Sequence, residues 1–143
     1  MGRGGLRGNP MVLNGGPSGY TRQHVTLLFS DLCGFTSLAE SVDPEVVLEI
    51  IHRIKAAADS VLRRHLGLLN QDYGDGVMAI FGFPTPQEDD VRRATEAALE
   101  LHRVIPKLAL GSLLPSGFNA GMHSGIHSGV AVVGDGVPRL WRY

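Results

Sequence analysis

Two aspartates, Asp31 and Asp75, occupy positions where a carboxylate is able to do chemistry. Asp31 comes just after an apolar, partly β-branched segment, VTLLF (residues 25–29), and Asp75 lies between Gly74 and Gly76. A buried strand tolerates a carboxylate only where its charge is paired, hydrogen-bonded or bound to a metal. Oxygen ligands select hard cations such as Mg²⁺ or Mn²⁺, and Mg²⁺ usually takes one or two carboxylates together with substrate phosphates.

The segment after Asp31 is suited to binding phosphate. It reads LCGFT (residues 32–36), a glycine-containing turn that leads into the start of a helix. Backbone N–H groups at such a turn are able to bind anions. Two metal ions held by the aspartates, with a triphosphate at the turn, would serve phosphoryl transfer. One ion would activate the attacking oxygen and the other would stabilise the leaving pyrophosphate.

The elements that position these residues follow from hydrophobic periodicity and from helix start and stop signals. Asp43-Pro44 is a typical helix start, Gly67 ends that helix, and Glu88-Asp89-Asp90 begins another that Pro106 stops. The turn at Gly74-Asp75 predicts a hairpin. The expected elements are a strand over 24–30, a short helix over 34–40, a helix from 44, strands over 68–73 and 76–81, a helix from 88, and strand-like runs over 118–123 and 130–133.

This order of elements predicts an α+β, ferredoxin-like (split βαβ) fold, an antiparallel sheet with helices packed on one face. In that topology the first strand lies beside the third and antiparallel to it. The end of the first strand, with Asp31, then meets the start of the third, with Asp75. Two carboxylates so close repel each other, so one is protonated or a cation bridges them.

Three segments together resemble the class III adenylyl/guanylyl cyclase catalytic domain: VTLLFSDLCGFTSLAE, NQDYGDGVMAIFGFPTPQEDD and GIHSGVAVVGD. The resemblance runs from about His24 to Asp135. It implies conversion of ATP, or GTP, to a 3′,5′-cyclic nucleotide and pyrophosphate. It also implies a homodimer, or a pair with a complementing cyclase subunit, whose active sites lie at the interface and draw on both chains.

The same resemblance implies specific site residues. Two ions, Mg²⁺ or Mn²⁺, would be held by Asp31 and Asp75, with the carbonyl of Leu32 as a further ligand. The phosphate contacts would come from the backbone amides of Cys33, Gly34, Phe35 and Thr36.

Two departures from the family pattern affect these expectations. The position that usually reads the base, Lys in adenylyl and Glu in guanylyl cyclases, is Gln71 here, which offers both a donor and an acceptor. The NQ…GDG segment around Gln71 resembles that of a bacterial adenylyl-cyclase subgroup, and this resemblance favours ATP. The sequence also ends at RLWRY, before the segment that supplies a second base-reading residue and the transition-state Asn and Arg. We therefore expect the 143 residues alone to have little or no cyclase activity.

Composition limits the other assignments. The 143 residues, 43% of them hydrophobic, suffice for one small domain with a core, and the formal net charge of −1 gives no support for a nucleic-acid partner. One cysteine, Cys33, fits a reducing compartment. No apolar run is long enough for a membrane span, so a cytoplasmic protein without direct membrane insertion is expected. Residues 1–22, rich in Gly and Pro, are predicted to be a flexible leader or linker, and residues 23–143 a cyclase domain lacking its C-terminal part.

Each motif also has a plainer interpretation. Asp75 alone, between glycines, is more typical of a simple hairpin, and Cys33 of a small residue in a tight turn. His123 and His127, four residues apart around Gly125 in an expected strand and turn, are more typical of ordinary polar or core roles than of metal ligands. Two alternative functions stay open: an inactive cyclase-like regulatory or dimerisation module, and another phosphoryl-transfer enzyme of the diguanylate cyclase kind.

Overall fold

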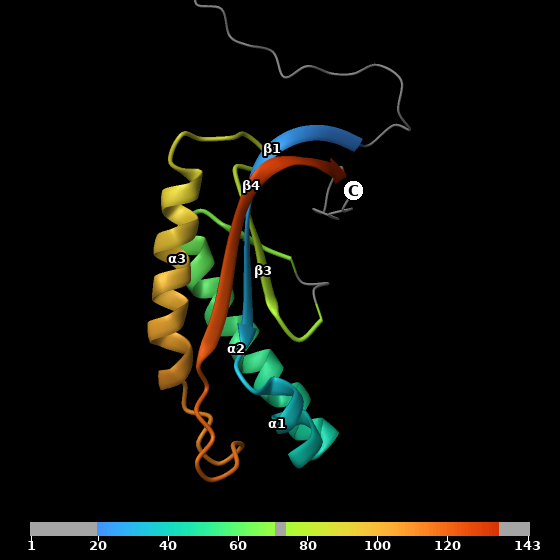
Figure 1. Ribbon diagram of the computed structural model, residues 1–143, viewed down its shortest axis with the longest axis vertical. Coiled ribbons are helices and arrows are strands. Elements are labelled where there is room, and N and C mark those ends of the chain that lie inside the picture. Colours follow the sequence, from blue (N-terminus) through green and yellow to red (C-terminus); the bar gives the residue numbers. More distant parts are fainter. Residues whose placement is uncertain (1–19, 71–73, 135–143) are drawn as a thin grey trace, which may run out of the picture.

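The computed structural model describes residues 20–70 and 74–134, which form a four-stranded antiparallel sheet with helices (Figure 1). The strand order is β2-β3-β1-β4, the order of the ferredoxin-like fold, so the predicted fold class is confirmed. None of the described helices is both long and apolar enough to cross a membrane. The elements, in chain order, are β1 (Tyr20–Leu32), α1 (Phe35–Ser41), α2 (Pro44–Arg64), β2 (Leu68–Leu69), β3 (Val77–Phe81), α3 (Asp90–Val104), the 3₁₀ helix η1 (Ile105–Lys107) and β4 (Met122–Gly134).

The pairing of β1 with β3 is the feature that positions the site. The two strands are antiparallel, with Thr26 opposite Phe81 and Ser30 opposite Val77. The carboxyl end of β1 therefore meets the amino end of β3, as the sequence predicted. Asp31 follows the last of these pairs, and Asp75 comes two residues before β3 begins.

The main core lies between one face of the sheet and the helices α2 and α3. Helix α2 starts after Asp43 with Pro44 in its first turn, as expected, and Arg63 and Arg64 occupy its last turn, where the helix dipole favours positive charge. Its buried stripe packs on the sheet because apolar residues recur at helical spacing. The central members of this core are Leu28, Ile50, Ile54, Ala58, Leu62, Val77, Ala79, Phe81, Ala94, Ala97 and Leu101.

Several boundaries differ from the sequence-based expectation. Of the strand expected over 68–73, β2 covers Leu68–Leu69, and residues 71–73 lie outside the described residues. Strand β1 begins at Tyr20, so residues 20–22 belong to the domain and not to the leader. In place of the two runs expected over 118–123 and 130–133 there is one continuous strand, β4, which starts only at Met122 and pairs with β1 along all 13 residues. Residues 118–121 are not in a strand. The prediction of a turn around Gly125 was wrong, because Gly125 lies within β4. Glycine is a weak strand former, but the regular ladder with β1 outweighs that local preference.

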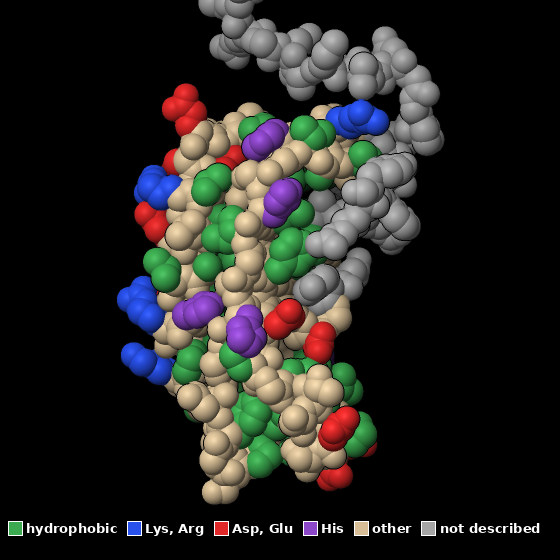
Figure 2. All heavy atoms as spheres, viewed as in Figure 1, with side chains coloured by type: hydrophobic (Ala, Val, Ile, Leu, Met, Phe, Trp, Pro, Cys, Tyr) green, Lys and Arg blue, Asp and Glu red, His purple; other side chains and the backbone are tan. Residues whose placement is uncertain are grey.

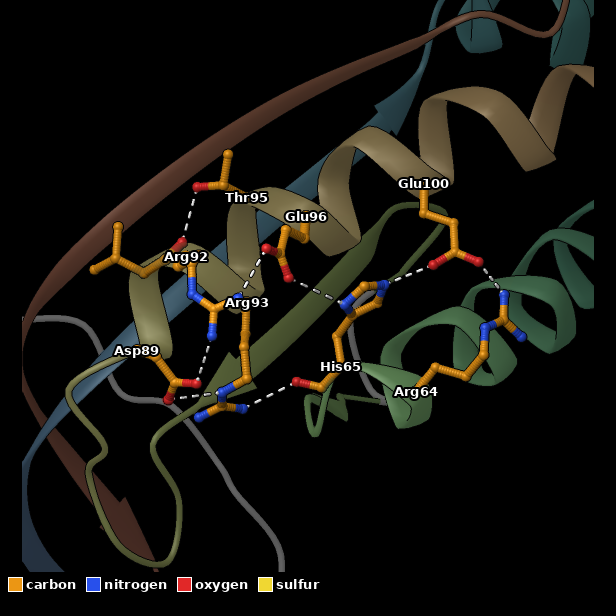
Figure 3. A network of polar contacts seen from close by, with 9 residues as sticks. Arg64, His65, Asp89, Arg92, Arg93, Thr95, Glu96 and Glu100 are labelled. Atoms are coloured by element: carbon orange, nitrogen blue, oxygen red, sulfur yellow. Dashed lines mark hydrogen bonds and ion pairs between the residues drawn. The ribbon is translucent and has the colours of Figure 1, made fainter.

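A network of charged side chains joins the end of α2 to α3 (Figure 3). Glu100 accepts hydrogen bonds from Arg64 and from the Nε2 of His65 at 2.6 Å. Nearer the start of α3, Arg93 donates to Asp89, to Asp90 and to the carbonyl oxygen of His65. The network therefore ties the chain reversal after α2 to the first turns of α3.

We expect Glu100 to make folding stability pH-dependent. Hydrogen bonds from Arg64 and then from His65 hold the pKa of Glu100 below its ordinary value. The folded state thus favours the ionised form, so this stabilisation is present above the unfolded-state pKa. It is lost as the pH falls through the folded-state pKa.

The measurement compares the unfolding free energies of wild type and Glu100→Gln between pH 7 and pH 3. The wild type should be the more stable protein at pH 7, and the difference should shrink as the pH falls. Arg93 lowers the pKa of Asp89 in both proteins, so that contribution cancels in the comparison. A difference that stays constant with pH would contradict the assignment.

Candidate active site

Asp31 and Asp75 line the same cleft, at the edge of the sheet where β1 ends and β3 begins. The cleft has a volume of about 400 Å³, and both carboxylates are exposed. Its lining also includes Leu32 and the start of α1, namely Gly34, Phe35, Thr36 and Ser37. Two aspartates 44 residues apart in the sequence are therefore brought to one place, together with the turn that was expected to hold phosphate.

Strand alternation explains how Asp31 and Leu32 share the end of β1. Leu32 is 7% exposed and packs into the core between sheet and helices, whereas Asp31 is exposed. Successive strand residues point to opposite faces, so burial of Leu32 turns the Asp31 carboxylate to solvent. A charged side chain next to a buried strand end thus avoids the cost of desolvation.

The turn between β1 and α1 depends on Gly34. Its φ of +70° lies in the left-handed region, which favours glycine. As the N-cap residue, Gly34 has no side chain with which to bond the N–H groups of the first turn of α1. The first bond back to it comes from the N–H of Leu38, at 3.0 Å. The amides before Leu38 face the start of a helix, where an anion is favoured.

Of the other predicted site residues, Cys33 is already engaged in a backbone hydrogen bond, and Gln71 is not described by the structure. The backbone N–H of Cys33 donates to the carbonyl oxygen of Gly121 at 2.8 Å, so this amide is already engaged. Cys33 is half-buried and is not among the residues that line the cleft. Gln71, the predicted base-reading residue, lies outside the described residues.

The donor set of the cleft suits a hard cation that brings or shares other ligands. Within residues 20–70 and 74–134, no three His, Cys, Asp or Glu side chains are grouped so that they could hold a metal ion. Two carboxylates and the Leu32 carbonyl, all oxygen donors, leave room for phosphate and water. That is the usual way in which proteins bind Mg²⁺, so the residues fit such an ion.

The structure adds two residues to the neighbourhood that the sequence did not single out as functional. His123 lies directly opposite Asp31 in the β1–β4 ladder, and both are exposed. Figure 2 shows histidine and acidic side chains together on this face of the molecule. Lys55, on α2, donates from Nζ to the carbonyl oxygen of Gly74 at 2.5 Å. The sequence did not reveal the Lys55 contact, because a lysine on an amphipathic helix is usually just a solvent-exposed residue. It did not place His123 opposite Asp31, because that pairing requires β4 to be one continuous strand.

The ferredoxin-like sheet, with paired aspartates and an uncapped helix start at one edge, defines an α+β domain of the nucleotidyl cyclase type. Residues 19–143 match the family described as the adenylate and guanylate cyclase catalytic domain. The chain belongs to that family.

Solved structures show the same fold. The guanylyl cyclase Cya2 is 32% identical to this chain, with a TM-score of 0.72 over 86% of this chain and 64% of that chain. The adenylyl cyclase CyaB from P. aeruginosa is 24% identical, with a TM-score of 0.69 over 80% of this chain and 60% of that chain. The second likeness, at its lower identity, concerns the fold alone.

Curated relatives are considerably longer than this chain. The uncharacterized protein Rv1319c of Mycobacterium tuberculosis is 31% identical over 99 residues, which are 66% of this chain and 18% of that protein. An adenylate cyclase of Mycobacterium bovis is 29% identical over 83 residues, 58% of this chain and 19% of that protein. The chain therefore spans less than one fifth of the length of these relatives.

Proposed function

We propose that this domain converts a nucleoside triphosphate to a 3′,5′-cyclic nucleotide and pyrophosphate. The observation that carries the proposal is the cleft shared by Asp31, Asp75 and the turn at Gly34. Membership of the cyclase family supports the reaction class. The cleft supplies the two requirements of that chemistry that belong to one chain: carboxylates for divalent ions and backbone amides for phosphate.

In this proposal each part of the cleft has a separate task. Asp31, Asp75 and the carbonyl oxygen of Leu32 hold Mg²⁺ or Mn²⁺, two ions in all. These ions, when bound, supply charge neutralisation of the triphosphate and activation of the 3′-hydroxyl. The amides of Gly34, Phe35 and Thr36 bind and orient the phosphates. We leave Cys33 out of this contact because its N–H already donates to Gly121.

We further propose ATP as the preferred substrate and a dimer as the active form. The named relatives do not favour one base: Cya2 is called a guanylyl cyclase, and the Mycobacterium bovis relative an adenylate cyclase. A Gln at position 71 is able to pair with either base edge, which predicts weak discrimination. Active sites formed between two chains are expected for the cyclase family, to which this chain belongs, and this expectation supports a dimer as the active form.

The direct test is formation of cyclic AMP from ATP and of cyclic GMP from GTP in the presence of Mn²⁺. The chain is assayed alone and mixed with a cyclase chain that lacks both of its metal aspartates. We expect little turnover alone and clear turnover in the mixture. Binding of Mn²⁺ and nucleotide without turnover in either arm would favour the alternative, a regulatory or dimerisation module.

Base choice is tested at Gln71 in the same mixture. Gln71→Lys should raise the ratio of kcat/KM for ATP to that for GTP, and Gln71→Glu should lower it. Gaining or losing one well-placed hydrogen bond to the base changes the discrimination between ATP and GTP by about 1–3 kcal/mol. Ratios that are equal in wild type and both variants would show that Gln71 does not read the base.

A further inference from the structure

Among the described residues, Lys55 connects helix α2 to the turn that carries Asp75. Its Nζ donates to the carbonyl oxygen of Gly74, 19 residues further along the chain, at 2.5 Å. The residue before Lys55, Ile54, is 4% exposed and belongs to the main core. The ammonium group therefore projects from a helix whose position is set by core packing.

The carbonyl group that accepts this hydrogen bond lies next to Asp75 in the chain and so influences the orientation of the Asp75 backbone. The carbonyl of Gly74 belongs to the peptide group that joins Gly74 to Asp75. Because a peptide group is planar, fixing this oxygen also restricts the direction in which the Asp75 backbone leaves the turn. Gly74 has a φ of +30°, and among the described residues a Cβ at this position would meet nothing within 4 Å. Glycine has more backbone freedom than any other residue, so a hydrogen bond to its carbonyl oxygen restricts a position that would otherwise be adaptable.

The positive charge of Lys55 and its hydrogen bond should have opposite effects on the affinity of the cleft for a cation. An ammonium group beside a turn that carries a carboxylate repels an incoming cation. If Lys55 acted only through its charge, its removal would strengthen cation binding. If it acts by holding the turn, its removal weakens binding, so the sign of the effect separates the two roles.

We propose that Lys55 is a positioning residue for Asp75, which keeps the carboxylate in the cleft shared with Asp31 and thereby strengthens binding of a divalent cation. This inference rests on the proposed function of the cleft. Lys55 does not contact the cation in this account. It acts through the Gly74–Asp75 peptide, as residues around a metal site commonly act through the ligands themselves.

The binding test uses the full chain, Mn²⁺ alone as the probe, and titration calorimetry at constant ionic strength. Lys55→Met removes the donor and the charge while keeping chain length and helix propensity. We expect it to weaken Mn²⁺ binding by roughly 10-fold. Lys55→Arg, which retains a donor and the charge, should restore binding to within about 3-fold. An affinity in Lys55→Met equal to or higher than that of wild type would overturn the proposal.

The control is Lys107→Met. The sequence contains only these two lysines, and Lys107 is exposed in η1, at the end of α3. Its replacement removes the same charge without touching the turn, so Mn²⁺ affinity should be unchanged. A loss equal to that of Lys55→Met would assign the effect to net charge and overturn the positioning role.

A second readout needs no metal and keeps the two proposals distinguishable. Amide hydrogen exchange over residues 74–77, in metal-free protein, should be about 10-fold faster in Lys55→Met than in wild type and should recover in Lys55→Arg. If wild type binds no Mn²⁺, the proposed function of the cleft fails, while exchange still tests Lys55. Unchanged exchange in Lys55→Met would show that Lys55 does not hold the turn.

Discussion

Replacing Asp31 with asparagine is expected to weaken Mn²⁺ binding at least about 30-fold and to abolish measurable cyclisation in the complementation mixture. At about 4 Å, one carboxylate and a unit positive charge interact by ~1 kcal/mol in bulk water and ~4 kcal/mol near a protein surface, and a divalent ion doubles this. A loss of about 2 kcal/mol, the lower limit of that range, is a factor of about 30. Asparagine keeps the shape of the side chain, so β1 should be unaffected.

Asp75→Asn is expected to have the same effect, because both carboxylates line one cleft. Titration calorimetry with Mn²⁺ measures binding, and the production of cyclic nucleotide measures turnover. Glu40→Gln is the matched control, since it removes an exposed carboxylate from α1, which begins at the cleft, without touching the proposed ligands. If only one of the two aspartates affected binding, they would not form a shared site.

Replacing Arg93 with methionine is expected to reduce the free energy of unfolding by about 3–5 kcal/mol, the usual cost of removing one partner of a buried ion pair. Asp90 is 4% exposed, and Arg93 donates to it from a side chain that is 10% exposed. Without the guanidinium, the Asp90 carboxylate keeps the hydrogen bond from the backbone N–H of Gln87, at 2.8 Å, but loses its compensating charge. The guanidinium also lies 6.0 Å from the ring centroid of Phe81, so its packing is lost as well.

The neighbouring Arg92 provides a matched control for this prediction. Arg92 pairs with Asp89 and Glu96 from the same helix, but its side chain is 64% exposed. Exposed pairs contribute about 0–1 kcal/mol, so Arg92→Met should have a small effect in urea unfolding. Adding Asp90→Asn to Arg93→Met should recover part of the loss, because the uncompensated charge is then removed. Equal destabilisation by Arg92→Met and Arg93→Met would contradict the role of burial.

The local pattern of the sequence was sufficient for much of the fold. The apolar spacing in α2, with Asp43-Pro44 before it, predicted a helix that the structure confirms. Helix α3 begins at Asp90, within the acidic segment expected to start it, and its α-helical part ends at Val104, just before Pro106. These features depend on residues within a few positions of one another, which is why sequence alone determined them. The order of elements then restricted the sheet to an arrangement in which β1 lies beside β3.

Tertiary structure decided the features that depend on contacts between distant segments, which local sequence preferences predict wrongly or not at all. Gly125 suggested an interruption, yet β4 is continuous because β1 offers a backbone partner at every one of its positions. The hydrogen bond from Cys33 to Gly121 joins segments 88 residues apart, and that from Lys55 to Gly74 joins a helix to a turn. The sequence by itself indicated candidate residues for binding a cation and phosphate. Only the packed chain decided which amides are already engaged and which side chain contacts the turn before Asp75, because those contacts exist only after distant segments have met.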